Sequence, residues 1–273
     1  MSRINSIFQT QDPKILNVYC TAGYPHLNST LEVMKALQQY GADIIELGMP
    51  YSDPLADGPV IQQSSSIALA NGMTIKKLFE QLKDFRSNAP SGVPEQAKGR
   101  NIVRGISIPV ILMGYMNPVL QYGFEKFCAD AAAIGIDGLI LPDLPEYEFE
   151  AEYGAIIKKH GLDFIFLVTP ETSDARIKKL DSLSSGFLYA VSSSSTTGSD
   201  KNAANTNEYL RRLKNLKLKN PVLLGFGISN KQAFDAVCQQ ADGAIIGSAY
   251  IKALENNPDV NTATKSFLSS ILD

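Results

Sequence analysis

The sequence has few cysteines, few histidines and no long apolar run. Its three cysteines, Cys20, Cys128 and Cys238, are odd in number and lie far apart, which argues against a disulfide framework or a C-x-x-C metal site. We expect buried thiols in a reducing compartment. No segment approaches the roughly 18 apolar residues of a transmembrane helix, and residues 1–12 lack the apolar run of a signal peptide. These absences predict a cytoplasmic protein that does not enter a membrane.

The chain also lacks a strong excess of charge of either sign. A formal net charge of −3 creates no field that would attract nucleic acid or an anionic membrane surface. No cluster of His, Asp and Glu has the spacing of metal ligands, so we expect no metal. With 44% hydrophobic residues, the 273-residue chain can bury a large core. This balance favours chemistry on a small molecule.

Eight short runs rich in Ile, Leu and Val indicate the architecture. Such runs without alternation are typical of strands covered on both faces, as in parallel sheets. The predicted strands are 15–20, 43–48, 109–114, 138–142, 163–168, 186–191, 221–227 and 243–248, and helical patterns lie between them. The alternation predicts an α/β fold in which residues 1–273 form a single (β/α)8 TIM barrel, with 87–104 as a surface insertion. A doubly wound open sheet is the alternative.

Two acidic residues stand out at the end of the second predicted strand. Glu46 lies in an otherwise apolar run, where burying a carboxylate costs several kcal/mol unless it is paired or protonated. Asp57 follows in a Pro/Gly-rich loop at the carboxyl end of the same strand. Two carboxyl groups in contrasting environments are typical of a general acid/base beside a carboxylate that stays ionised.

Glycine turns after the seventh and eighth predicted strands indicate a phosphate site. Gly225-Phe226-Gly227 and Gly247-Ser248 would let backbone N–H groups and helix N-termini approach an anion at the place where barrels bind phosphate. The alternative is that these glycines only make tight turns. The sixth strand adds Tyr189 and the hydroxyl-rich loop 192–199, which we interpret as a lid, with a plain crossover as the alternative.

Four motifs together resemble one known family over essentially the whole chain. They are Thr21-Ala22-Gly23-Tyr24-Pro25, the segment 46–59 (ELGMPYSDPLADGP), Gly225-Phe226-Gly227-Ile228 and Ile246-Gly247-Ser248. With them the sequence resembles the α subunit of tryptophan synthase. The segment around Asp57 is specific to that family, whereas many phosphate-binding barrels share the glycine turns. The resemblance implies a lyase of tryptophan biosynthesis that cleaves indole-3-glycerol phosphate to indole and glyceraldehyde 3-phosphate by retro-aldol chemistry.

The resemblance also implies roles for particular residues. Glu46 would be the general acid/base that protonates the indole ring carbon, and Asp57 would hold the indole N–H. The matching substrate-binding positions are Tyr19, Tyr115, Tyr189, Thr197, Gly198, Gly227, Gly247 and Ser248, with Tyr19 in place of the more usual Phe. The sixth loop departs from the family pattern, because Ser193, Ser195 and Thr196 precede Thr197-Gly198 where many members have an Arg and a Gly-Val pair.

A partner subunit is the last implication of the resemblance. The family passes indole to a β subunit that holds pyridoxal phosphate, so we expect an α2β2 heterotetramer and no cofactor in this chain. Asp53 matches a position that faces the β subunit, although it could instead cap a turn before Pro54. Two other functions remain open: a non-catalytic activating subunit, or another phosphate-binding barrel isomerase. The triose isomerase type needs a Lys, a His and a Glu at strand ends, and only His26 and His160 are available as the histidine.

Overall fold

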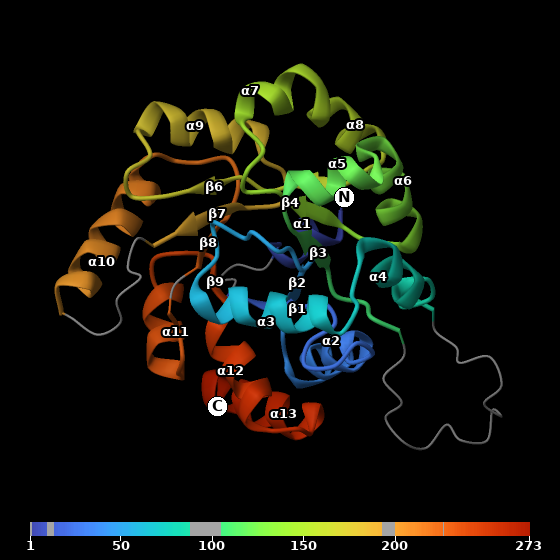
Figure 1. Ribbon diagram of the computed structural model, residues 1–273. Helices are drawn as coiled ribbons and strands as arrows, with labels where there is room; N and C mark the ends of the chain where they lie inside the picture. Colours follow the sequence, from blue (N-terminus) through green and yellow to red (C-terminus); the bar gives the residue numbers. More distant parts are fainter. Residues whose placement is uncertain (1, 10–13, 88–104, 193–199, 226) are drawn as a thin grey trace.

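The strands of the protein form one continuous parallel sheet. The computed structural model describes residues 2–9, 14–87, 105–192, 200–225 and 227–273 (Figure 1). The strands are β1 (Ile15–Thr21), β2 (Ile44–Gly48), β3 (Val110–Met113), β4 (Gly138–Ile140), β5 (Asp163–Phe164), β6 (Leu167–Val168), β7 (Leu188–Val191), β8 (Val222–Gly225) and β9 (Gly243–Ile246). All eight segments predicted to be strands therefore contain one, and most are shorter than predicted.

The order of the strands shows that the sheet closes on itself. It runs β5-β4-β3-β2-β1-β9-β8-β7-β6, so β5 and β6 are its two ends. Only Ile165 and Phe166 separate these ends along the chain. The Ile165 N–H donates to the Leu139 carbonyl on one side, and the Tyr189 N–H donates to the Phe166 carbonyl on the other. The predicted strand 163–168 is therefore divided into two short strands, β5 and β6, which together occupy the fifth strand position of a TIM barrel. The open-sheet alternative is wrong.

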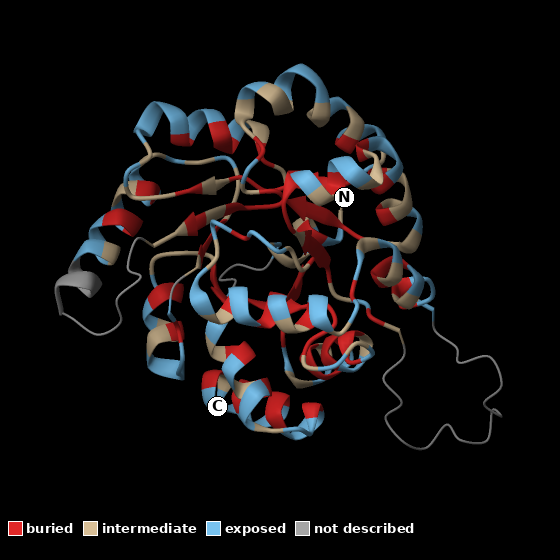
Figure 2. Cartoon of the chain, in the orientation of Figure 1, coloured by how far each residue is buried: buried red, intermediate tan, exposed pale blue. Residues whose placement is uncertain are grey.

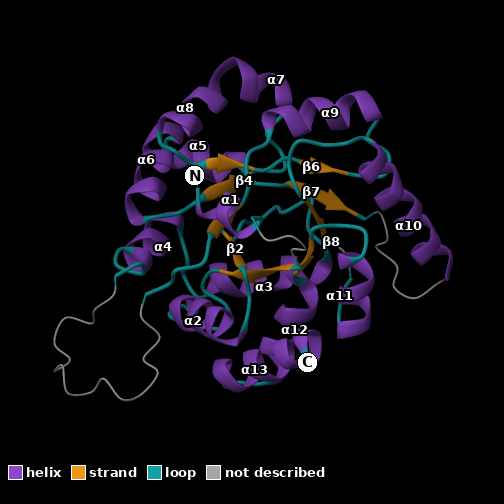
Figure 3. Ribbon diagram, turned by 180° about the vertical axis from the view of Figure 1, so that it is seen from behind, coloured by secondary structure: helices purple, strands orange, loops and turns teal. Residues whose placement is uncertain are grey.

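The first helix packs against the interior at one end of the barrel, and the other helices surround it on the outside (Figures 1 and 3). The helices are α1 (Arg3–Ile7), α2 (Thr30–Tyr40), α3 (Pro59–Ala70), α4 (Ile75–Leu82), α5 (Met116–Tyr122), α6 (Phe124–Ile134), α7 (Glu146–Glu148), the π-helix η2 (Phe149–Tyr153), α8 (Gly154–Lys159), α9 (Asp174–Leu183), α10 (Asp200–Asn215), α11 (Lys231–Cys238), α12 (Ser248–Asn256) and α13 (Val260–Leu272). Several begin at a side chain that accepts a first-turn N–H, as Thr74 does for α4 and Asn230 for α11. The predicted insertion 87–104 lies almost wholly outside the described residues, which end at 87 and resume at 105.

Apolar side chains fill the half of the barrel interior that lies toward the amino ends of the strands. One cluster contains a buried residue from, or next to, the strand at each of the eight positions around the barrel: Ile15, Ile44, Ile111, Ile140, Ile165, Phe187, Leu223 and Ile245. Ile4 of α1, which is fully buried, joins the same cluster. A β-carbon added at Gly186 would lie 2.8 Å from Cγ2 of Ile4, so α1 packs tightly against the strands there. Any open volume inside the barrel must therefore lie toward the carboxyl ends of the strands.

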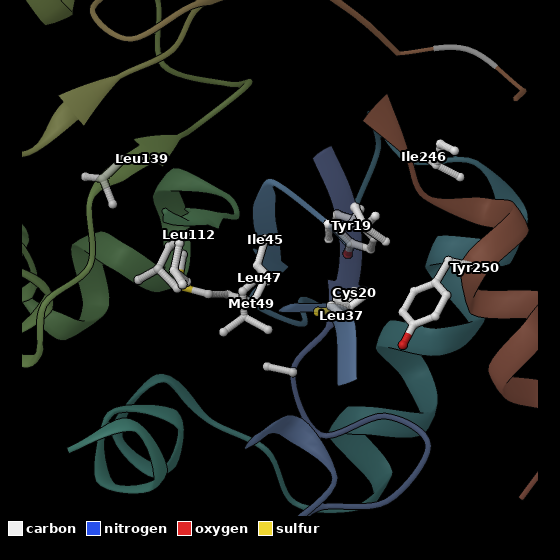
Figure 4. Close-up of a cluster of buried hydrophobic side chains, with 14 of the residues drawn as sticks. Tyr19, Cys20, Leu37, Ile45, Leu47, Met49, Leu112, Leu139, Ile246 and Tyr250 are labelled. Atoms are coloured by element: carbon white, nitrogen blue, oxygen red, sulfur yellow. The ribbon is translucent and has the colours of Figure 1, made fainter. Parts of the chain in front are cut away.

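The larger core lies between the sheet and the helices. Figure 2 shows the buried strands at the centre and the exposed faces of the helices around them. Figure 4 shows part of this layer, in which Ile45 and Leu47 of β2 lie beside Leu112 of β3. Cys20, Cys128 and Cys238 are all buried, as expected. Within the described ranges, no helix is long and apolar enough to cross a membrane.

Candidate active site

A cavity of about 180 Å³ opens among the carboxyl ends of the strands. Seven of the residues predicted to form the site line it: Tyr19, Glu46, Asp57, Tyr189, Gly227, Gly247 and Ser248. Its other lining residues are Ile61, Met113, Gly225, Ile228, Ile245 and Ala249. The tertiary fold thus brings together side chains from β1, β2 and β7 and turns near β8 and β9. Thr197 and Gly198 lie outside the described residues, as does most of the predicted lid 192–199.

Glu46 is a buried carboxyl group in the middle of the sheet. It lies on β2 with only 1% of its surface exposed. Asn17 of β1 donates a hydrogen bond from Nδ2 to Oε2 of Glu46 at 2.8 Å. Burial raises the pKa of Glu46 to about 8, the Asn17 hydrogen bond opposes that rise, and the nearby Asp57 adds to it. Glu46 is therefore mostly protonated at neutral pH yet can release its proton at little cost.

Asp57 lies in the loop between β2 and α3 and is half-buried. The Tyr115 hydroxyl donates to Oδ2 of Asp57 at 3.0 Å and accepts a hydrogen bond from the Ala56 N–H at 3.1 Å. Gln62 donates to the Asp57 carbonyl, which holds the loop against α3. Burial raises the pKa of Asp57, and the hydrogen bond from Tyr115 opposes that rise because it favours the ionised form. Tyr115 thus supports Asp57 rather than lining the cavity.

Two tyrosines form aromatic walls, and neighbouring glycines make room for them. A β-carbon at Gly48 would lie 2.1 Å from the Tyr19 hydroxyl oxygen, and one at Gly225 would lie 2.6 Å from Cε1 of Tyr189. Any larger residue at either glycine would displace the ring. Burial raises the pKa of both tyrosines well above the ordinary value, so their hydroxyls remain neutral.

The opposite side of the cavity consists of backbone at a helix N-terminus. Helix α12 starts at Ser248, with Gly247 as its N-cap residue. Gly247, Ser248 and Ala249 all line the cavity. The first N–H groups of a helix have no partner within the helix, and the helix dipole favours negative charge there. This end of the cavity can bind a phosphate group.

Two other predicted positions lie outside the cavity. Asp53 is exposed in the loop that leads to Asp57, where it accepts a hydrogen bond from the Ser52 hydroxyl at 2.5 Å. His26 is exposed and does not line the cavity, so the described residues place no histidine where an isomerase needs its electrophile. A search of the described residues finds no group of three His, Cys, Asp or Glu that could hold a metal ion.

Asn17 is the polar contact of Glu46 that sequence reasoning missed. Its signal was present, because Asn17 interrupts the apolar run of β1 and lies two residues before Tyr19 on the same face. The apolar residues Ile61 and Met113 of the cavity wall were also missed. They look like ordinary core residues in the sequence, and only the folded chain shows that they face the cavity.

The fold and the site together define a class of protein: a (β/α)8-barrel enzyme in which two carboxyl groups share one cavity with a glycine turn and a helix N-terminus. A family model described as "Tryptophan synthase alpha chain" matches residues 7–95 and 96–270. The tryptophan synthase alpha chain of Flavobacterium johnsoniae is 51% identical over 258 residues, which cover 94% of this chain and 95% of that relative. That of Parabacteroides distasonis is 46% identical over 99% of both chains.

Solved structures give the same result. The tryptophan synthase subunit alpha from Legionella pneumophila is 33% identical with a TM-score of 0.84, covering 99% of this chain and 97% of that one. A chain of tryptophan synthase from M. tuberculosis is 30% identical with a TM-score of 0.80, covering 99% and 100%. This chain belongs to the tryptophan synthase alpha chain family. It is a lyase of tryptophan biosynthesis that cleaves indole-3-glycerol phosphate to indole and glyceraldehyde 3-phosphate, as the sequence predicted.

The raised pKa of Glu46 predicts how stability depends on pH. Between its ordinary value of 4.5 and about 8, the folded protein keeps a proton on Glu46 that the unfolded chain releases, so stability falls as pH rises through this window. Glutamine at position 46 does not titrate. We therefore expect the free energy of unfolding of Glu46→Gln minus that of wild type to be larger at about pH 8 than at about pH 5, by on the order of 3 kcal/mol.

Urea unfolding at the two pH values measures this difference. The control is Glu80→Gln, which makes the same chemical change at an exposed position on α4. A difference between Glu46→Gln and wild type that does not change with pH would contradict the assignment of a buried, protonated Glu46.

Proposed function

We propose that Glu46 and Asp57 perform the cleavage of indole-3-glycerol phosphate with separate roles, Glu46 as the proton donor and acceptor and Asp57 as the partner of the indole N–H. The observation that carries this proposal is that both carboxyl groups face one cavity in different surroundings. Glu46 is 1% exposed with a pKa near 8, whereas Asp57 accepts a hydrogen bond from Tyr115.

The reaction needs a proton delivered to carbon. Protonated Glu46 transfers its proton to C3 of the indole ring, which leaves positive charge at the ring nitrogen and a carboxylate at Glu46. The negative charge of Asp57 stabilises the ring N–H at that stage. The bond between C3 and the glycerol carbon then breaks, and its electron pair returns to the ring. The adjacent hydroxyl gives its proton to Glu46 and becomes the aldehyde, which restores the starting state.

The rest of the cavity supports binding of this substrate. The rings of Tyr19 and Tyr189 offer apolar walls for the indole, and the turns at Gly227, Gly247 and Ser248 offer N–H groups for the phosphate. Thr197 and Gly198 are proposed as further substrate contacts on the basis of the resemblance alone. We propose that this chain holds no cofactor and that pyridoxal phosphate belongs to the β partner.

The family's members partner with a β subunit, and we propose an α2β2 assembly for this chain in the cytoplasm. Its contact surface would include the loop that carries Asp53. Leu55 in the same loop is 93% exposed, so docking there would remove a large apolar side chain from water. Docking there would order the loop that carries Asp57, which gives the partner a means of raising activity.

The first prediction for this function concerns Glu46. Glu46→Gln keeps the shape of the side chain but cannot transfer a proton, so we expect indole formation to fall by at least about 100-fold. Binding of glycerol phosphate should stay within threefold of wild type, because its anchor lies at the other end of the cavity. Glu80→Gln is the matched control on an outer helix. Activity of Glu46→Gln within about tenfold of wild type would remove Glu46 from the mechanism.

Asp57→Asn tests the second carboxyl group. The amide keeps the shape but loses the negative charge that faces the ring nitrogen, so we expect turnover to fall by about 100-fold or more. Glycerol phosphate should still bind, and the exposed Asp84→Asn serves as the control. If Asp57→Asn lost phosphate binding and turnover in parallel, Asp57 would serve to fold the loop instead.

The partnership is tested by measuring indole release with and without a cognate β subunit. We expect the bound β subunit to raise the rate at least about tenfold, equivalent to roughly 1.4 kcal/mol of barrier. Asp53→Ala should reduce that stimulation more than it reduces the basal rate, whereas Asp84→Ala should change neither. Equal rates with a β subunit shown by sedimentation to be bound would contradict the coupling and leave the lyase assignment intact. No basal turnover at all would favour a non-catalytic activating subunit.

A further inference from the structure

The strand register places Asn17 beside the carboxyl group of Glu46. Strands β1 and β2 are parallel neighbours with Asn17 opposite Ile44 and Tyr19 opposite Glu46. Asn17 is fully buried and Glu46 is 1% exposed, so the contact between the two side chains is closed to water. The 2.8 Å hydrogen bond from Asn17 is the one that Glu46 receives from a side chain in the described ranges. The position of the Glu46 carboxyl group therefore depends on Asn17.

The amide of Asn17 also carries a hydrogen-bond acceptor that is unpaired. Its Oδ1 atom is buried and has no hydrogen-bond partner among the described residues. An amide offers a donor on one side and an acceptor on the other, and rotation by about 180° exchanges them. An ionised Glu46 accepts from the NH2 group, as in the structure, whereas a protonated Glu46 needs an acceptor for its own proton. Oδ1 of the same side chain is that acceptor.

We propose that Asn17 is a positioning residue that holds the Glu46 carboxyl group in one place through both of its protonation states, donating from Nδ2 to the carboxylate and, after rotation, accepting at Oδ1 from the acid. The inference rests on the proposed role of Glu46, which releases and regains one proton in each turnover. An apolar residue at position 17 would leave the carboxylate, formed when the proton moves to carbon, buried without a donor.

The surroundings of Glu46 make this donor decisive. The titratable groups that interact electrostatically with it are Asp57, Tyr19, Tyr189 and Cys20. None of them is a cation, and Asp57 raises the pKa of Glu46 further. The Asn17 hydrogen bond is the contact that lowers this pKa. Removing it should therefore make Glu46 harder to ionise and leave its carboxyl group free to adopt other rotamers.

The test compares Asn17→Leu, which keeps a similar volume but no polar atom, with Asn17→Ser, whose hydroxyl can both donate and accept. Carbon-13 labelling of the Glu side chains, with the Glu46 signal assigned by Glu46→Gln, reports ionisation without turnover. We expect Asn17→Leu to lower the ionisation constant of Glu46 at least about tenfold. Its kcat for indole formation should fall at least about tenfold, with KM within threefold of wild type. The rate of Asn17→Leu should also persist to higher pH, because the acid form starts the reaction.

Asn17→Ser should restore part of both effects, and it keeps the test usable if Asn17→Leu does not fold. The matched control is Thr264→Val in α13, which removes a fully buried hydroxyl that bonds the Tyr250 hydroxyl of α12 and the Val260 carbonyl of its own helix. It should lower stability and leave both the ionisation of Glu46 and kcat unchanged.

Two results would overturn the proposal. One is an ionisation constant of Glu46 in Asn17→Leu and Asn17→Ser within twofold of wild type; the other is a kcat in both variants that matches Thr264→Val. Failure of the proposed function is recognised separately, because full activity of Glu46→Gln would remove Glu46 from the reaction whatever the titration of the Asn17 variants shows.

Discussion

The cavity of this protein is built around one costly feature, a carboxyl group buried inside a parallel barrel. Glu46 is surrounded by β1, β2 and the two tyrosines of the cavity, with Asn17 as its hydrogen-bond donor. Burial penalises the charged form and brings the pKa of Glu46 to about 8, where the group can both give and take a proton near neutral pH. The same burial raises the free energy of the ionised form. A side chain that can hydrogen-bond both the acid and the carboxylate, as the amide of Asn17 can, offsets that cost.

The barrel makes that environment by filling one end and leaving the other open. Ile4 and the apolar side chains around the barrel fill the interior toward the amino ends of the strands, directly beneath the cavity. Above that layer, the inward positions of β1 and β2 carry Asn17 and Glu46 instead of apolar residues. Rings from Tyr19 and Tyr189 fit over Gly48 and Gly225, which lack the β-carbons that would collide with them. The sheet thus holds the Glu46 carboxyl group, while a loop holds Asp57.

The separation between sheet and loop has a functional consequence. Asp57 belongs to the same loop as Asp53 and the exposed Leu55, so the proposed contact with a partner would act on Asp57, whereas Glu46 lies in the sheet. The proposed phosphate end of the cavity is separate from both, because it is made from turns near β8 and β9 and from the start of α12. The three proposed roles, phosphate binding, proton transfer and contact with a partner, therefore fall on different elements of one barrel.

The sequence by itself determined the strand segments, the buried state of Glu46 and the glycine turns, because apolar runs, an isolated carboxylate among them and Gly-rich strand ends are local patterns. Together with the family motifs, it also indicated the lyase reaction. Only the tertiary structure decided that Asn17 meets Glu46 across 29 residues of chain, that Tyr115 hydrogen-bonds Asp57 across 58, and that β5 and β6 close the barrel. These contacts depend on the register between strands and on loop paths, and neither is encoded in the pattern of a single segment.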